Sequence, residues 1–382
     1  MIDDKYKTTA NRMNKAGGTA APIDENLIEL LKLIIPEEDD LDFINKSFRR
    51  KASQTMEELK QSSGRSEEEI LEKVVKLAKK GVMMNQPNRH GVMVHKLMPF
   101  IDVGLFEYTF MGPLERNEHN MKLAKLYQNM FDKLFGMVQS NYDKIIPMLV
   151  DSVAFTDRTV PLLKNKETGE DVPIIVNKEI EVPEDEIIPA QDIEEIINKF
   201  DYIAVGHCFC RHLQDLIDNP CKMNGPREAC FTFGKSAHHV AENGFGRLVS
   251  KEEAMKIMRE CQEAGLIHKA YHPHFDIHKD ETSICNCCND CCGQSGSHIP
   301  THSWARYISR VNQDMCIGCE TCIDKCQFGA LEMNNEGKAE RIEGESDNCM
   351  GCGICASACP ENAIEMVEQP RRVCILPPKI AN

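Results

Sequence analysis

"CIGCETCIDKC" at residues 316–326 and "CMGCGICASACP" at residues 349–360 decide the fold of the C-terminal part of the chain. Both stretches have the cysteine spacing C-x2-C-x2-C-x3-C, and the second begins 33 residues after the first. Ala330 and Ala363 also occupy equivalent positions after the two sets of cysteines. A spacing this regular, present in two copies, predicts a duplicated metal-binding loop.

The spacing has a physical reason. Two-residue gaps allow three thiolates of one tight loop to reach three corners of a 4Fe-4S cubane, and Gly318 and Gly351 leave backbone amides free to point at sulfur. The fourth ligand comes from the other repeat. A zinc module is the alternative, but zinc needs four ligands and offers no reason for eight at these intervals. We predict one cluster on Cys316, Cys319, Cys322 and Cys359, and a second on Cys349, Cys352, Cys355 and Cys326.

Through these motifs, residues 308–368 resemble the bacterial two-cluster ferredoxin family. The resemblance implies a two-cluster ferredoxin fold for the tail. One position departs from the motif, because Gln327 stands where the second repeat has Pro360. This departure removes no ligand, although it changes the local rigidity of the loop.

Residues 24–100 predict three short helices followed by a hairpin. "DENLIELLKLII" has apolar residues at helical spacing, and capping boxes start the next two helices at Thr55 and Ser66. This order is typical of a winged helix. The start of the last helix is acidic, from Glu67 to Glu69, and it would repel phosphate at the position where such folds bind DNA. We therefore expect a structural or partner-docking module and no nucleic-acid partner.

The predicted fold class is α+β. The winged-helix-like domain takes residues 1–100, and a helical segment takes residues 101–170. A cysteine-rich α/β middle domain takes residues 171–307, and the two-cluster ferredoxin domain takes residues 308–382.

Composition points to a cytoplasmic protein. The 382 residues contain no apolar run long enough to span a membrane, and the first residues lack the apolar core of a secretory signal. All nineteen cysteines lie from Cys208 onward. In a reducing cytosol, such cysteines are metal ligands or redox groups and not disulfides. The formal net charge of -15 also disfavours nucleic acid as a partner.

The middle of the chain holds two further groups of cysteines. Cys208, Cys210, Cys221 and Cys230 form a C-x-C-x10-C-x8-C set, sufficient for one 4Fe-4S cluster or one zinc ion. "ICNCCNDCCGQSG" at residues 284–296 adds Cys285, Cys287, Cys288, Cys291 and Cys292 as additional candidate ligands. Neighbouring side chains diverge, so adjacent cysteines are not expected to bind one cluster. Cys261, on the apolar face of a helix, is expected to lie in the core.

Three interpretations of the middle site stay open. It holds a third 4Fe-4S cluster, with room for a fourth, or it holds zinc, or it is a dithiol that cycles with a disulfide. The cluster is favoured because clusters are normally connected to one another, and two are predicted just downstream.

As a whole, residues 24–368 resemble multi-domain 4Fe-4S binding proteins of anaerobic bacteria and archaea. In that family a helical N-terminal domain, a "C-x-C-R" segment, a "C-N-C-C" segment and a two-cluster ferredoxin tail follow in this order. The resemblance implies an electron carrier or an electron-transfer subunit of an oxidoreductase complex. The sequence shows no flavin or nucleotide fingerprint, so we expect a partner oxidoreductase that holds the flavin, corrinoid or other substrate site, and a soluble electron donor or acceptor.

Two other functions remain as alternatives. The middle site could belong to a redox enzyme that reduces a disulfide or a small substrate. The winged helix could instead belong to a redox-sensing regulator. No catalytic residue is identified from the sequence.

Overall fold

The structure is a computed structural model that describes residues 2–88, 90–113, 115–152, 157–166, 168–176, 192–272, 279–293, 300–344 and 347–380. Its mixed helix and strand content is α+β, as predicted. The chain forms two compact units, and each unit combines segments that are distant in sequence. Unit 1 contains Met1–Ser140, Gly206–Pro220 and Lys235–Leu248. Unit 2 contains Asn141–Val205, Cys221–Gly234 and Val249–Asn382.

The first part of unit 1 contains short helices and a small sheet. The helices are α1 (Ile2–Asn14), α2 (Glu25–Ile34), α3 (Glu38–Ser47), α4 (Met56–Ser63) and α5 (Glu67–Lys79). The antiparallel sheet has the order β1-β3-β2, from β1 (Ser53–Thr55), β2 (Met83–Pro87) and β3 (Met93–Leu97). Sequence reasoning missed α1, α3 and β1. The winged-helix assignment stays a prediction, because these elements alone do not decide it.

Both predicted capping boxes are present. Glu58 N donates to Thr55 Oγ1 at 3.4 Å, and Thr55 N donates to Glu58 Oε2 at 2.9 Å at the start of α4. The same exchange joins Ser66 and Glu69 at the start of α5. Each box satisfies backbone donors that have no partner within the helix, so the sequence determines where both helices begin.

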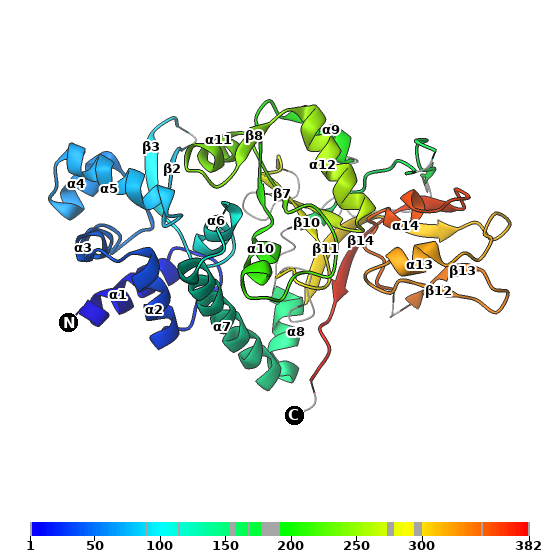
Figure 1. The fold of residues 1–382 in the computed structure, drawn as a ribbon, viewed down its shortest axis with the longest axis horizontal. Coiled ribbons are helices and arrows are strands. Elements are labelled where there is room, and N and C mark those ends of the chain that lie inside the picture. The colour runs from blue at the N-terminus through cyan, green and yellow to red at the C-terminus, as the bar shows by residue number, and fades with distance from the viewer. Residues whose placement is uncertain are drawn as a thin grey trace. The chain divides into compact units, whose positions relative to one another are not determined.

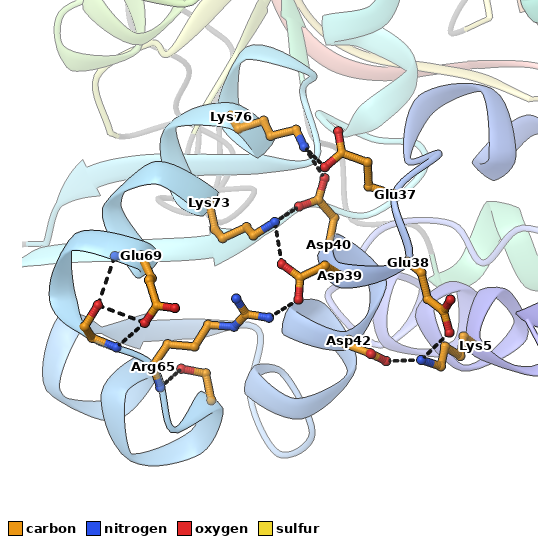
Figure 2. A network of polar contacts seen from close by, with 12 residues as sticks. Lys5, Glu37, Glu38, Asp39, Asp40, Asp42, Arg65, Glu69, Lys73 and Lys76 are labelled. Carbon is orange, nitrogen blue, oxygen red and sulfur yellow. Dashed lines mark hydrogen bonds and ion pairs between the residues drawn. The ribbon is translucent and has the colours of Figure 1, made fainter.

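An ion-pair network joins α3 to α5 (Figure 2). The Asp40 side chain is fully buried, and its two oxygens lie 2.6 Å from Lys73 Nζ and 2.9 Å from Lys76 Nζ. Lys73 also pairs with Asp39, which in addition contacts Arg65. Burial opposes ionisation of Asp40, yet the hydrogen bonds from both lysines outweigh it and hold its pKa below the ordinary value. These lysines are therefore neutralised within unit 1.

The remaining helices of unit 1 complete one apolar core. They are α6 (Leu105–Met111), α7 (Glu118–Ser140), α10 (Phe209–Leu216) and α11 (Lys235–Glu242). Phe106 lies at the centre of the core, with its ring 5.4 Å from that of Tyr127 and 5.5 Å from that of Phe209. None of the helices in the described part of the chain is long and apolar enough to cross a membrane.

Unit 2 is built on a mixed sheet. The sheet order is β5-β14-β11-β4-β9-β10-β7-β6-β8, and the last two strands lie where the chain passes between the units. The strands are β4 (Asp157–Thr159), β5 (Ile174–Ile175), β6 (Ile203–His207), β7 (Glu228–Phe233), β8 (Arg247–Val249), β9 (Ile267–Tyr271), β10 (Ser283–Cys287), β11 (Thr301–Val311) and β14 (Ile364–Ile375). The helices are α8 (Tyr142–Ser152), α9 (Ile193–Lys199), α12 (Lys251–Glu263), α13 (Thr321–Lys325) and α14 (Ile354–Ser357).

The two long antiparallel strands β11 and β14 support the tail. They pair from Thr301 opposite Ile375 to Val311 opposite Ile364. In Figure 1 these strands lead into the region that holds α13, α14 and the small hairpin of β12 (Leu331–Met333) and β13 (Ala339–Arg341). Residues of both long strands line the two cavities of the tail, so the duplicated loops are built on one shared hairpin.

Candidate metal centres

The first cavity of the tail is lined by residues of both repeats. Four cysteines line it: Cys316, Cys319, Cys322 and Cys359. The first three surround the start of α13, whereas Cys359 follows α14 in the second repeat. Val311 and Ile364, from β11 and β14, line the same cavity. One cavity therefore receives cysteines from both repeats.

The second cavity has the reciprocal composition. Its cysteines are Cys326, Cys349, Cys352 and Cys355. Cys326 follows α13 and is supplied by the first repeat. Ser309 Oγ lies 3.7 Å from Cys349 Sγ, so β11 contacts this group directly. The structure thus brings together the same two groups of four cysteines that the sequence pairs, while iron ligation itself stays a prediction.

Glycines allow both loops to close tightly. Gly318 and Gly351 have φ values of +69° and +65°, in the left-handed region that side chains disfavour. A Cβ atom on Gly318 would lie 2.2 Å from Gly337 O, and one on Gly351 would lie 2.3 Å from Tyr307 O. Any other residue at either position would push the loop away from the backbone that supports it.

Backbone amides point at the cysteine sulfurs at equivalent places in the two repeats. Ala330 N donates to Cys326 Sγ at 3.3 Å, and Ala363 N donates to Cys359 Sγ at 3.3 Å. These are the two alanines that the repeat aligns. Hydrogen bonds of this kind favour the charged thiolate, which is the form that binds metal.

Burial disfavours the charged thiolate form of three tail cysteines when no metal is bound. It raises the pKa of Cys322 to about 11, that of Cys352 to about 12 and that of Cys355 well above its ordinary value. Bound iron would supply the missing positive charge and displace these protons. Grouped sulfurs, amide donors and apolar lining together fit a thiolate-ligated iron-sulfur cluster in each cavity.

Residues 309–366 match a family model described as "4Fe-4S dicluster domain". This part of the chain is a 4Fe-4S dicluster domain. A protein named "Probable ferredoxin" from Methanosarcina thermophila is 44% identical over 38 residues. That match covers 10% of this chain and 66% of the relative, slightly less than two thirds of its length. No solved structure matches the chain.

Upstream of the dicluster domain, three cysteine sulfurs of unit 2 form a compact group, here called the triad. Cys221, Cys288 and Cys291 have sulfurs that all lie within 4.8 Å of one another. Cys288 Sγ is 3.6 Å from Cys221 Sγ and 3.5 Å from Cys291 Sγ. Among the described residues, no other set of three or more potential ligand side chains is this compact.

Local hydrogen bonds hold the triad together. The Asp290 carboxylate accepts a hydrogen bond of 2.9 Å from Lys222 N, which ties the segment after Cys221 to the loop of Cys288 and Cys291. The two thiols beside Cys288 hydrogen-bond to it, with backbone amides in support, and they lower its pKa to about 2. The pKa of Cys221 rises to about 11, chiefly through the same contact with Cys288. Of the three thiols, Cys288 is the one that accepts hydrogen bonds from both neighbours.

The other cysteines of the middle region form a separate array on the sheet. Cys230 of β7 lies opposite Cys285 of β10, and these two sulfurs hydrogen-bond. Cys287 contacts both Cys285 and Cys292. Adjacent Cys287 and Cys288 thus belong to different groups, as expected from the divergence of neighbouring side chains.

A buried lysine lies on the same face of the sheet as this array. Lys269 of β9 is opposite Cys285, and its ammonium group lies 2.8 Å from Asp157 Oδ2. Burial lowers the pKa of Lys269, but Asp157, Cys287 and the neighbouring thiols outweigh that effect and keep the residue charged. The sheet therefore holds a charged lysine beside the array, although neighbouring thiols and burial raise the pKa of Cys285 and of Cys287 well above the ordinary value.

The predicted set of Cys208, Cys210, Cys221 and Cys230 is distributed over several places. Cys208 and Cys210 belong to unit 1, at the start of α10. Within unit 2, Cys221 contacts Cys288, whereas Cys230 contacts Cys285. A four-cysteine site made of this set stays a prediction. Cys261 is fully buried in α12, as expected.

Gln327 connects the dicluster domain to the triad loop. Asn289 N donates to Gln327 Oε1 at 2.8 Å, and the Asn289 side chain donates to Gln327 O. Gln327 follows Cys326, while Asn289 follows Cys288. Gln327, the residue that departs from the ferredoxin motif, therefore joins the dicluster domain to the loop that carries Cys288 and Cys291. Sequence reasoning noticed Gln327 but could not identify its partner, and it missed Asp290 and Lys269 altogether.

Proposed function

We propose that this chain is an iron-sulfur electron-transfer protein, which relays single electrons through 4Fe-4S clusters to or from a partner oxidoreductase in anaerobic metabolism. The two cavities of the dicluster domain, each lined by four cysteines drawn from both repeats, carry the proposal. The proposed ligand sets are those predicted from the sequence. When bound, such clusters exchange single electrons with little movement of their ligands.

The surface near the first cavity supports electron exchange at that end. Cys319 is exposed, and the Ile317 side chain beside it is 64% exposed. Both residues line the first cavity. In the second cavity none of the four cysteines is exposed: Cys349 is buried, and Cys326, Cys352 and Cys355 are half-buried. The first cavity is therefore the place where a soluble donor or acceptor would approach the sulfurs most closely.

The nature of the partner is inferred from what this chain lacks and from its charge. The sequence shows no flavin or nucleotide fingerprint, so the proposed partner is the protein that holds the flavin or other substrate site. The net charge of -15 would steer docking toward a basic surface. Nucleic acid is not a proposed partner, because Lys73 and Lys76 of α5 are paired with Asp39, Asp40 and Glu37.

Anaerobically purified protein is expected to contain about eight irons and eight acid-labile sulfides per chain in the dicluster domain. After reduction with dithionite, we expect an electron paramagnetic resonance spectrum of two interacting 4Fe-4S clusters. The clusters lie in adjacent cavities of one small domain, so their spins should couple. Colourless protein, or protein that accepts no electrons from a strong reductant, would rule out the proposal.

Thiol chemistry at the triad is a second candidate function. The observation that favours it is the close grouping of three thiols, with Cys288 Sγ 3.6 Å from Cys221 Sγ and 3.5 Å from Cys291 Sγ, because thiol–disulfide exchange requires sulfurs in contact. Alkylation of the cluster-intact protein separates the two functions. A loss of activity without a loss of iron would favour an enzyme acting at the triad, whereas full electron transfer after alkylation would favour the relay.

A further inference from the structure

The spacing of the sulfurs distinguishes the triad from the groups in the dicluster domain. In a tetrahedral site, metal–sulfur bonds of about 2.3 Å place sulfurs on the same ion about 3.8 Å apart. In a cubane each thiolate binds a different iron, so the sulfurs stand farther apart. The contacts of 3.6 Å and 3.5 Å made by Cys288 match the first arrangement.

The dicluster domain provides an internal comparison. Its eight cysteines all lie in the described part of the chain, yet none of them joins a group of three with sulfurs within 4.8 Å. Their wider spacing goes with a separate cavity for each group of four. In the triad, by contrast, the sulfurs touch one another directly.

We propose that Cys221, Cys288 and Cys291 bind a single tetrahedral metal ion, zinc or iron, and not a third 4Fe-4S cluster. Three thiolates would be supplied by the triad, and the fourth position would be filled by another side chain or by water. The backbone amides of Asp290 and Cys291 hydrogen-bond to Cys288, and that of Met223 hydrogen-bonds to Cys221. Amides aimed at sulfur in this way stabilise the thiolates that a metal ion requires.

Two residues outside the triad would position its ligands. Asp290 holds the segment of Cys221 through Lys222 N, and Gln327 holds the backbone of Asn289. Outer-sphere partners of this kind typically change metal affinity by about 10- to 100-fold when they are removed. The ion would thus lock the loop of Cys288 and Cys291 against the segment of Cys221, while Gln327 ties the same loop to the dicluster domain.

The first test is the metal and sulfide content of full-length protein carrying Cys288→Ser. We expect the loss of about one zinc or one iron per chain with acid-labile sulfide unchanged, because a single thiolate-bound ion contains no inorganic sulfide. Cys374→Ser is the matched control, since Cys374 lies in β14 and lines neither tail cavity. Loss of about four irons with about four sulfides would overturn the proposal, as would unchanged metal content.

The second test does not depend on a variant that folds. X-ray absorption of the wild-type protein at the zinc edge is expected to show sulfur neighbours at about 2.3 Å, and their number gives the fourth ligand. If zinc is absent, the same ion should appear as high-spin mononuclear iron in the Mössbauer spectrum. Protein with neither signal would refute the site. These readouts report on the triad ion and not on the clusters of the dicluster domain. A failure of the electron-transfer proposal can therefore be told apart from a failure of the triad proposal.

Gln327→Pro tests the positioning role of Gln327. Proline restores the residue found at Pro360 but cannot hydrogen-bond to Asn289 through a side chain. We expect a chelator to remove the triad metal about 10-fold faster, with the reduced cluster spectrum of the dicluster domain retained. An unchanged rate of metal loss would exclude this role.

Discussion

Replacing both Cys316 and Cys359 by alanine is expected to remove no more iron than replacing Cys359 alone. Both sulfurs line the first cavity, although they belong to different repeats. The single change should therefore already cost one cluster, about four irons and four sulfides per chain. Replacing Cys359 together with Cys349, which line different cavities, should cost about eight of each. Iron and acid-labile sulfide after anaerobic purification provide the measurement.

The opposite pattern would show that each cluster is bound within a single repeat. In that case the pair Cys316 and Cys359 would cost about eight irons, and the pair Cys349 and Cys359 about four. Cys374→Ser again serves as the control and should leave the tail clusters intact. Electron paramagnetic resonance adds a second readout, because a chain with one remaining cluster should lose the spin coupling and keep a simple signal.

Asp40→Asn is expected to destabilise the contact between α3 and α5 by about 2 kcal/mol. This is less than the ~3–5 kcal/mol typical of breaking a fully buried ion pair, because the lysines are partly solvated. Asp40 is the buried acceptor for both Lys73 and Lys76, and the change leaves two ammonium groups without their common partner. Hydrogen exchange at neutral pH, read on peptides covering residues 38–47 and 67–79, should show protection reduced by about 30-fold.

Asp42→Asn is a matched control on the same helix. Asp42 pairs with Lys5, but its side chain is 37% exposed, so the pair is screened by water. We expect a cost below about 1 kcal/mol and little change in exchange. Equal effects of the two variants would show that the buried position of Asp40 gives it no special role. Neither variant touches a cysteine, so cluster content should stay constant in both.

The elements that could be predicted are those with local causes. The capping boxes at Thr55 and Ser66 lie where expected, because each is completed within four residues. Helix α3 was missed, since its sequence is strongly acidic and its apolar residues are few. Its stability depends on partners from α5, such as Lys73, that lie far along the chain. The division into two interleaved units could not be predicted either. Segments 206–220 and 235–248 belong to unit 1, but nothing in their sequence marks them as separate from the segments around them.

The same distinction separates the two cysteine-rich regions. In the tail, the positions of the cysteines depend on short stretches of sequence. Gly318 and Gly351 allow the loops to close, and each repeat supplies three cysteines to its own cavity. The amino-acid order alone was enough to determine a 4Fe-4S dicluster domain there. In the middle, adjacent Cys287 and Cys288 point to different partners, and Cys221 reaches Cys288 across 67 positions of the chain. Only the folded structure decides those groupings, because they join distant segments: strand register brings Cys230 opposite Cys285, and loops bring Cys221 to Cys288.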